Sequence, residues 1–540
     1  MGNRKIALVD ICRDYDYFLE NLGVESIAAT LENHNYIVTQ HKFRISRIDL
    51  KAITYNSPLA IGFSTGMHNI KSVLAICKEI KKNNSAIFIF LGGYTASFFS
   101  EKIMQESGFI DAIIIGEGEV TATELLDAIS SNSSIQNVNG IVYKLDGKIV
   151  KTPSRERIKN LDELPMPKRQ LLLETESKIA YIESSRGCLC SCSFCSLTEF
   201  WKTNKKCCLS EKSIERIIEE ISSVINTYQI NRFSFVDATF EHSIINKSDK
   251  KIHSLIASLK NNKLKINFYV TSRVEIIKFV PHETIVNLID NGLRGIFLGV
   301  ESFYQNDLLL FNKRTTVYDN IMAIEFFKKF PIKLSIGLIN FHPFSTIEQL
   351  KTNAFFCHKY NCAHNFCLID SLMLFQGTSI YDLCLSKNLI VSENYDKCAY
   401  MFVNSSVQLL YDAIEQFFDK NDLYQKAEKI KYHFAEFQDI LFEIICDISV
   451  DADSKDFVCE HYDFLTKKCN ELNDFNYYWF NSLLELFNDD TPKKSHLLDF
   501  INDLDLISFY EKLHAELEEK KFSFLFRMRK FNKKLFERIV

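Results

Sequence analysis

Four cysteines lie within one short stretch of the sequence, at a spacing typical of metal ligands. Cys188, Cys192 and Cys195 form a C-x-x-x-C-x-x-C pattern, and Cys190 lies between the first two. Three thiolates on one loop can occupy three corners of a cubane iron–sulfur cluster and leave the fourth iron open to another ligand. A four-iron cluster with a free coordination site is one chemistry that fits this loop.

Zinc is the alternative metal for these thiols. Structural zinc needs four ligands, usually in two well-separated pairs. On paper, the second pair can come from Cys207 and Cys208 or from the group Cys357, Cys362 and Cys367. That last group follows a helical pattern, which matches a zinc knuckle poorly. A dense thiol loop without any metal would be open to oxidation, so the spacing favours a metal.

The composition is that of a large globular protein without a nucleic-acid-binding surface. The chain has 540 residues, 46% of them hydrophobic, and a formal net charge of -5. This length exceeds a single hydrophobic core, so several domains are expected, and the slight negative charge disfavours nucleic acids. The sequence has neither a secretory signal nor an apolar run of about 20 residues. We therefore expect a cytoplasmic protein without a transmembrane segment.

Most of the other cysteines are scattered along the chain. In a long chain without a signal sequence, such cysteines are expected to be small buried side chains rather than disulfides. This interpretation applies to Cys12, Cys77, Cys384, Cys398, Cys446, Cys459 and Cys469.

The first domain, residues 1–150, alternates short apolar runs with helical patterns. This alternation predicts a parallel sheet with helices on both faces. The apolar runs begin near Lys5, Leu59, Ala86 and Asp111. A hairpin turning at Asp146 and Gly147 is predicted to follow.

Small residues follow three of these predicted strands, at Ser64–Gly66, Gly92–Thr95 and Gly116–Glu119. Ligands bind at the carboxyl ends of parallel strands, and glycine lets a bulky ligand approach the backbone closely. Any one of these loops is also compatible with an ordinary tight turn. The three together on one rim indicate a ligand site.

A proline-containing linker at 151–180 leads to a second series of strands and helices at 181–390. Six or so strand patterns with intervening helices predict a full or partial β/α barrel. In that architecture, chemistry takes place at the carboxyl ends of the strands. The polar or thiol residues at these ends are Cys188, Asp237, Arg273 and Glu301. The patterns start near Ile179, Arg232, Ile266, Gly295, Leu334 and Cys367.

Residues 391–540 are rich in phenylalanine, poor in glycine and helical in pattern. The final basic amphipathic segment, 521–540, is compatible with a membrane surface or a partner protein. We expect it instead to be a terminal helix packed on its own domain.

The cysteine loop resembles that of the radical S-adenosylmethionine (SAM) superfamily, with Phe194 just before the last cysteine. The weaker motifs "FSFVDATF", "VTSRVE", "GLRGIFLGVESF", "LINFHPFST" and "MLFQGTSIY" follow in the order of its cobalamin-binding branch. The first part is similar to that branch's cobalamin-binding domain, and the resemblance covers roughly residues 1–390. It implies an N-terminal Rossmann-like cobalamin-binding domain, a partial TIM-barrel radical SAM domain and a C-terminal helical domain.

The resemblance implies a ligand set and SAM contacts. Cys188, Cys192 and Cys195 would bind a 4Fe-4S cluster, with SAM on its open iron and Cys190 outside the ligand set. The contacts expected for SAM are Phe194 beside the cluster, Glu301 and Ser302 at the ribose, and Asp237 and Arg273 at the amino and carboxylate ends. A structural ion pair is the alternative for each polar contact.

The resemblance also implies cobalamin contacts on the three small-residue loops. Tyr94 would face the corrin, and the first two loops would hold the nucleotide tail. The full set is Ser64, Thr65, Gly92, Gly93, Tyr94, Gly116, Glu117 and Gly118.

The sequence departs from the branch's pattern at several positions. There is no D-x-H-x-x-G motif, so cobalamin would lack a histidine axial ligand. The usual P-G-E-T reads "PFST" at Pro343–Thr346. His68 and His342 are expected to be satisfied or solvent-facing histidines.

The resemblance implies an enzyme that forms a 5′-deoxyadenosyl radical and methylates an unactivated carbon of a peptide, natural product or lipid. An electron donor such as flavodoxin or ferredoxin would reduce the cluster. A non-methylating rearrangement or cyclisation is the main alternative. Two others are a radical SAM enzyme without cobalamin and a zinc- or cluster-stabilised binding protein that acts through its helical C-terminal region.

Overall fold

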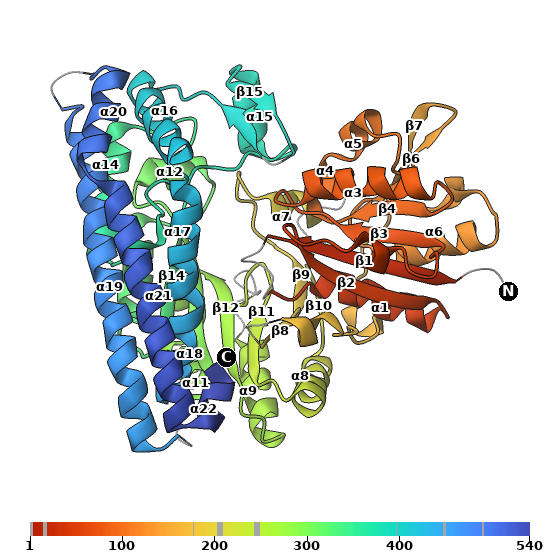
Figure 1. Ribbon diagram of the computed structural model, residues 1–540, viewed down its shortest axis with the longest axis horizontal. Helices are drawn as coiled ribbons and strands as arrows, with labels where there is room; N and C mark the ends of the chain where they lie inside the picture. Colours follow the sequence, from red (N-terminus) through yellow and green to blue (C-terminus); the bar gives the residue numbers. More distant parts are fainter. Residues whose placement is uncertain are drawn as a thin grey trace.

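A computed structural model describes residues 4–13, 19–175, 178–201, 209–241, 249–395, 397–446, 450–488 and 491–539. Figure 1 shows three parts in a row: a sheet with helices at the N-terminal end, a second sheet in the middle, and a bundle of long helices at the C-terminal end.

The first sheet has seven strands, in the order β2-β1-β3-β4-β5-β6-β7. The first five are parallel and the last two antiparallel. The predicted hairpin is confirmed, with positive φ at Asp146 and Gly147. The strands are β1 (Lys5–Cys12), β2 (Ile37–Arg44), β3 (Ala60–Ser64), β4 (Phe88–Gly92), β5 (Ala112–Ile114), β6 (Ile141–Leu145) and β7 (Lys148–Lys151).

Helices cover both faces of this sheet. Ile6 and Leu8 of β1 pack toward α1 and α6, whereas Val9 and Ile11 pack toward α3 and α5. This alternation explains why the strands are apolar on both sides. The helices are α1 (Leu22–Asn33), α2 (Leu50–Ile53), α3 (Ile70–Asn83), α4 (Tyr94–Phe98), α5 (Ser100–Glu106) and α6 (Glu119–Ser130).

The second sheet has five parallel strands in the order β14-β13-β12-β11-β8. It is a partial barrel, so the predicted fold class is confirmed. The strands are β8 (Ile179–Ile182), β11 (Arg232–Phe235), β12 (Asn267–Arg273), β13 (Leu293–Glu301) and β14 (Lys333–Leu338). The helices of this part are α8 (Ile214–Tyr228), α9 (Lys250–Asn261), α10 (Ile276–Phe279), α11 (His282–Asp290), α12 (Gln305–Leu310), α13 (Val317–Phe327), α14 (Ile347–Lys359) and α15 (Ser379–Ser386).

The prediction of a strand that starts near Cys367 is wrong. In the described chain it pairs only through a parallel bridge between Phe341 and Ser371. The Phe341 amide donates to Asp370 and its carbonyl accepts from Leu372. Two residues later, Pro343 has no N–H to continue a ladder, so the pairing ends at one residue.

Two short antiparallel strands flank the cysteine loop in the sequence, one before it and one after it. Strand β9 (Ser185–Gly187) ends one residue before Cys188 and pairs with β10 (Leu209–Glu211). Helix α7 (Ser196–Trp201) begins directly after Cys195. The cysteine loop is therefore held between a strand and a helix start.

The C-terminal part begins with two short strands and continues as helices. The helical prediction is correct except for β15 (Ile390–Glu393) and β16 (Cys398–Tyr400). Phe524, Met528 and Leu535 of the last segment are buried in the main core, so its packing on its own domain is confirmed. The helices are α16 (Ser405–Lys420), α17 (Leu423–Tyr432), a π-helical turn (His433–Phe437), α18 (Gln438–Cys446), α19 (Ala452–Glu485), α20 (Lys494–Asp503), α21 (Leu506–Phe531) and α22 (Lys533–Ile539).

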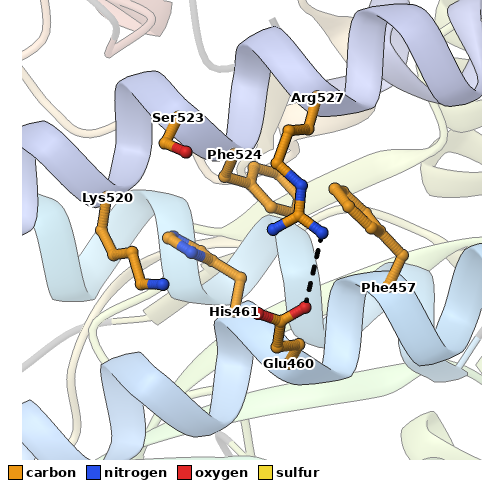
Figure 2. Close-up of a pocket in the computed structure, with 7 residues that line it drawn as sticks. All are labelled: Phe457, Glu460, His461, Lys520, Ser523, Phe524 and Arg527. Carbon is orange, nitrogen blue, oxygen red and sulfur yellow. Dashed lines mark ion pairs between the residues drawn. The ribbon is translucent and has the colours of Figure 1, made fainter.

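Helices α19 and α21 pack through aromatic and charged side chains (Figure 2). The Arg527 guanidinium lies over the Phe457 ring at 4.8 Å and pairs with Glu460 at 3.7 Å. The His461 ring stacks on Phe524 at 4.5 Å. The pocket between them measures about 20 Å³, which is room for about one water molecule and not for a ligand.

Among the described residues, no helix is both long and apolar enough to cross a membrane.

Candidate functional site

A cavity of about 500 Å³ lies between the first sheet and the second. All three small-residue loops line it, as the strand-end argument predicted. The predicted residues that reach it are Ser64, Thr65, Gly92, Gly93, Tyr94, Gly116, Glu117 and Gly118. The sheet topology brings them together, because β3, β4 and β5 are parallel neighbours whose carboxyl ends share one edge.

Two adjacent glycines play different parts in this rim. Gly93 has φ of 97°, and a Cβ added there would lie 2.6 Å from the Thr65 carbonyl oxygen, so only glycine fits. A Cβ added at Gly92 would meet no atom within 4 Å. Gly93 thus permits the turn, whereas Gly92 keeps open the space above the end of β4.

Thr65 fixes the shape of the first loop. Its hydroxyl donates to the Gly92 carbonyl at 2.7 Å and accepts from the Ala96 amide at 2.9 Å. These bonds tie the end of β3 to the end of β4 and the start of α4. The backbone that faces the cavity is therefore rigidly placed.

Hydrogen-bonded polar side chains that the sequence analysis did not predict lie at the floor of the cavity. The Asn21 amide donates to Asp10 at 2.8 Å and to the Ser64 hydroxyl at 3.2 Å. Asp10 also pairs with buried Lys42 at 3.3 Å. The position of Asp10 at the end of β1, on the same edge as Ser64, was the available signal.

The opposite wall comes from the second sheet and from α7, which were also missed. Tyr181, Glu183 and Arg186 contribute, together with Phe200 and Trp201. Phe200 and Trp201 end α7, close in sequence to Cys195, and that proximity was a usable signal.

Tyr94 and Phe200 meet across the cavity, from opposite domains. Their ring centroids are 4.3 Å apart. Burial raises the pKa of the Tyr94 phenol to about 12, so it stays protonated near neutral pH. The pair presents a neutral aromatic surface to whatever occupies the space.

Arg186 joins the two domains at the edge of the cavity. Its guanidinium pairs with Glu117 at 2.9 Å, Glu119 at 2.6 Å and Glu183 at 2.8 Å. Glu117 also accepts a hydrogen bond from the Ile158 amide at 2.8 Å. Glu117 lines the cavity as predicted, yet both of its carboxylate oxygens already have protein partners.

The cysteine loop lies half-buried between β9 and α7. Ser193 anchors it: its amide donates to the Phe311 carbonyl at 2.9 Å and its hydroxyl to the Leu310 carbonyl at 2.7 Å. The Phe194 ring packs edge-on against Phe311 at 5.3 Å. Phe194 therefore shapes the loop from the core side.

The surroundings of the loop fit a thiolate-bound cluster. Arg273 donates from Nη1 to the Cys192 sulfur at 3.2 Å, and buried Lys313 pairs with Glu301 at 3.1 Å. Positive charges beside the loop compensate the negative charge of bound thiolates. Cys188, Cys190, Cys192 and Cys195 are all half-buried, which leaves the loop accessible.

Cys190 stands next to Cys188. The Cys190 amide donates to the Cys188 sulfur at 3.4 Å. The pKa of the Cys190 thiol is lowered to about 6, chiefly by its hydrogen bond with Cys188. The assignment of Cys190 as a non-ligand stays a prediction.

Two of the residues predicted to contact SAM are Arg273, which hydrogen bonds to Cys192, and Glu301, which pairs with Lys313. Arg273 also pairs with Glu275 at 2.5 Å. Glu301 ends β13 with φ of 64°, an uncommon backbone conformation for a non-glycine residue. The assignment of Arg273 and Glu301 as SAM contacts stays a prediction.

Asp237 and Ser302 are engaged inside the protein. The Asp237 carboxylate accepts hydrogen bonds from the Ser184 hydroxyl at 2.9 Å and the Ser185 hydroxyl at 2.8 Å. Burial raises its pKa to about 6. Ser302 is fully buried and donates to Asp307 at 2.6 Å. Both residues make hydrogen bonds inside the protein, and their assignment as SAM contacts stays a prediction.

The two histidines behave differently. His342 is buried: its Nε2 lies 3.1 Å from Asp307, and its Nδ1 accepts from the Phe344 amide at 3.3 Å. His68 lines the cavity, and a Cβ on Gly66 would lie 2.8 Å from its ring. His68 therefore lies against the first loop and lines the cavity.

Two compact groups of possible metal ligands lie elsewhere in the described chain: Cys357, Cys362 and Cys367, and His433, His514 and Glu518. The helical pattern expected for the first group holds for Cys357 but not for Cys362 and Cys367, because α14 ends at Lys359. Cys207 and Cys208 lie outside the described residues. Of the scattered cysteines, Cys446 and Cys459 are half-buried and the others buried.

Comparison with known sequences supports the nature of the first domain. Residues 8–126 match the family model of the B12 binding domain. The chain is 29% identical over 360 residues to an uncharacterized methyltransferase of Pyrococcus horikoshii, across 65% of this chain and 74% of that protein. It is 28% identical over 290 residues to the anaerobic magnesium-protoporphyrin IX monomethyl ester cyclase of Rubrivivax gelatinosus, across 51% of this chain and 50% of the cyclase.

Comparison with solved structures identifies the fold. The chain is similar to OxsB, a cobalamin-dependent S-adenosylmethionine radical enzyme solved with aqua-cobalamin bound. The TM-score is 0.71 over 96% of this chain and 81% of that chain, at 18% sequence identity. Together with the B12-binding match, this shared fold confirms the resemblance that the sequence motifs predicted.

Proposed function

The chain contains a B12-binding domain and has the fold of a cobalamin-dependent radical SAM enzyme, and on that premise we propose that it binds cobalamin, a 4Fe-4S cluster and SAM, and methylates an unactivated carbon. The observation that carries the proposal is the cavity of about 500 Å³, which the three predicted loops line from one side and residues flanking the cysteine loop line from the other.

The residues of the cavity fit cobalamin. The space above Gly92 is open, and the cavity runs between β3 and β5 with glycine on all three loops. A flat macrocycle against such backbone needs few side-chain contacts. Tyr94 and Phe200 would face the edge or the plane of the macrocycle. The polar side chains around Asn21 would contact the buried nucleotide tail of cobalamin.

The cysteine residues fit a cluster with one open iron. Cys188, Cys192 and Cys195 would hold it, and Arg273 would hydrogen bond to the Cys192 sulfur and stabilise the added electron. Bound together, the cluster and SAM supply a 5′-deoxyadenosyl radical, and cobalamin carries the methyl group. Phe200 and Trp201 of α7 line the cavity and would keep solvent out of it.

The proposal includes the transfer of a methyl group and the class of its substrate. The similarity to a named methyltransferase supports transfer, and the substrate class covers a peptide, a natural product or a lipid. A flavodoxin or ferredoxin would supply the electron. The similarity to a cyclase favours the second candidate, a radical cyclisation or other modification without methyl transfer.

The deciding experiment is incubation of anaerobically purified, cluster- and cobalamin-loaded protein with SAM and a low-potential reductant. Formation of both 5′-deoxyadenosine and S-adenosylhomocysteine supports methylation. Deoxyadenosine without S-adenosylhomocysteine supports the second candidate. Protein that shows neither cluster absorption nor corrin bands after loading contradicts both.

A further inference from the structure

Three cysteines outside the proposed active site converge in the core between the second sheet and the helical bundle. The sulfur atoms of Cys357, Cys362 and Cys367 all lie within 4.8 Å of one another, and those of Cys357 and Cys367 are 3.7 Å apart. The three residues are at most 5% exposed. They are 10 residues apart in sequence at most, so local chain geometry produces the convergence.

The turn that carries these cysteines is fixed by the bundle. Helix α14 ends at Lys359, and the chain then turns back under α19. Asn473 of α19 accepts from the Ala363 amide at 3.0 Å, and Asn476 donates to the Ala363 carbonyl at 2.9 Å. Both asparagines are buried. The thiols are therefore presented by a preorganised turn.

The distances match one ion bound by several thiolates. A disulfide needs sulfurs about 2.05 Å apart, far closer than 3.7 Å. Tetrahedral zinc with Zn–S bonds of about 2.3 Å places its sulfurs about 3.8 Å apart. Three thiolates without a carboxylate select a soft or borderline d¹⁰ cation over magnesium or calcium.

A fourth ligand is available on the same turn. His364 lies between Cys362 and Cys367, and its Nδ1 is buried without a hydrogen-bond partner in the described part of the chain. His364 and Cys362 line one cavity of about 350 Å³. His364 is outside the 4.8 Å group, so its ring must turn toward the sulfurs to complete four-coordination.

The charges around the turn favour bound thiolates. Lys328 and Lys333 line the same cavity, and Lys431 lies over the Phe366 ring at 5.8 Å. A zinc ion with three thiolates and a neutral histidine carries a net charge of about -1. The lysines offset that charge, and the cavity reaches one of the three cysteines, Cys362.

We propose that Cys357, Cys362 and Cys367, with His364, form a structural zinc site that fixes the turn packed against α19. Binding replaces three thiol protons with one Zn²⁺, and no electron transfer is involved. The site is separate from the loop of Cys188, Cys192 and Cys195, and it stands whether or not the proposed methyl transfer is correct.

Metal analysis of the whole protein tests the site. Anaerobically purified protein is expected to contain about one equivalent of zinc in addition to its iron. The double variant C362S/C367S is expected to lose the zinc and keep the iron. The matched control Cys384→Ser replaces another buried cysteine and is expected to keep both metals.

Cobalt binding keeps the test independent of how well the double variant folds. In the background C188A/C192A/C195A, added Co²⁺ is expected to give thiolate-to-metal charge-transfer absorption and the strong visible bands of a tetrahedral ion. His364→Ala in that background is expected to weaken Co²⁺ binding and change these bands. Each of three results would overturn the proposal. They are wild-type protein that contains no zinc, a C362S/C367S protein that keeps its zinc, and a C188A/C192A/C195A protein that gives no Co²⁺ absorption.

Discussion

The guanidinium of Arg273 donates a hydrogen bond from Nη1 to the sulfur of Cys192, at 3.2 Å. Arg273 comes from the end of β12 and Cys192 from the loop after β9, 81 residues apart. The same guanidinium pairs with buried Glu275 at 2.5 Å, which holds it in this direction. A strand of the second sheet thus places a permanent positive charge on the cysteine loop.

Replacing Arg273 by glutamine is expected to make the cluster harder to reduce. The variant loses a charged hydrogen bond to a ligand sulfur, an interaction of about 1.5–3 kcal/mol. For a one-electron couple, about 1.4 kcal/mol corresponds to about 59 mV, so the midpoint should fall by about 60–130 mV. A redox titration followed by electron paramagnetic resonance measures the shift. Arg216→Gln, on α8, is the control, and an unchanged midpoint in R273Q would contradict the assigned role.

Gly92→Leu is expected to abolish cobalamin binding without unfolding the first domain. The new side chain would meet no protein atom at its Cβ and would extend into the cavity. Corrin absorbance retained after gel filtration measures binding, and circular dichroism measures the fold. Gly108→Leu is the matched control, because its Cβ is equally free but Gly108 does not line the cavity. If G92L binds cobalamin like G108L, the corrin lies elsewhere.

Single alanine variants of the cysteine loop are expected to distinguish the three cluster ligands from Cys190, which is predicted not to bind the cluster. C188A, C192A and C195A should lose the cluster, because each leaves an iron without its thiolate. C190A should retain iron and acid-labile sulfide near the wild-type ratio. Iron and sulfide analysis after anaerobic reconstitution gives the answer, and a C190A protein without cluster would reverse the assignment.

Replacement of Arg186 by methionine is expected to destabilise the contact between the domains. The variant leaves buried Glu117, Glu119 and Glu183 without their shared cation. Breaking a buried ion pair from one side costs about 3–5 kcal/mol. Thermal unfolding and limited proteolysis between the first two domains measure the effect. Arg47→Met replaces an exposed arginine of the first domain and should leave both unchanged. An R186M protein that matches this control would contradict a bridging role.

Glu241 is expected to make the stability of the second domain depend on pH. Burial raises the pKa of its carboxyl from 4.5 to about 7. The folded state then binds more protons than the unfolded state between these values, so stability falls as the pH rises from about 4.5 to 7. The loss from this group is about 3 kcal/mol, at about 1.36 kcal/mol for each pKa unit.

Glu241→Gln checks that expectation, because the glutamine oxygen can accept from the Arg273 amide and the Ser272 hydroxyl can rotate to accept from the glutamine nitrogen. The difference in unfolding midpoint between E241Q and wild type should grow in favour of the variant as the pH rises to 7. A difference that stays constant with pH would show that Glu241 titrates normally.

Local patterns in the sequence determined the strand ends and the cysteine loop. The loop after β3, the double glycine after β4 and the loop after β5 were identified without coordinates, because parallel strands place their carboxyl ends on one edge. The spacing of Cys188, Cys192 and Cys195 likewise reports geometry within a single loop. Such features involve neighbours in the chain, so composition and spacing are enough to find them.

Only the tertiary structure decided which distant groups meet. Arg186 joins the two domains, Phe200 closes the cavity against Tyr94, and Asp237 accepts hydrogen bonds from Ser184 and Ser185. The strand predicted from Cys367 was wrong, because Pro343 ends its pairing and the turn below it gathers three thiols instead. These outcomes depend on how sheets and helices pack, and packing between residues far apart in sequence leaves no local pattern from which to predict it.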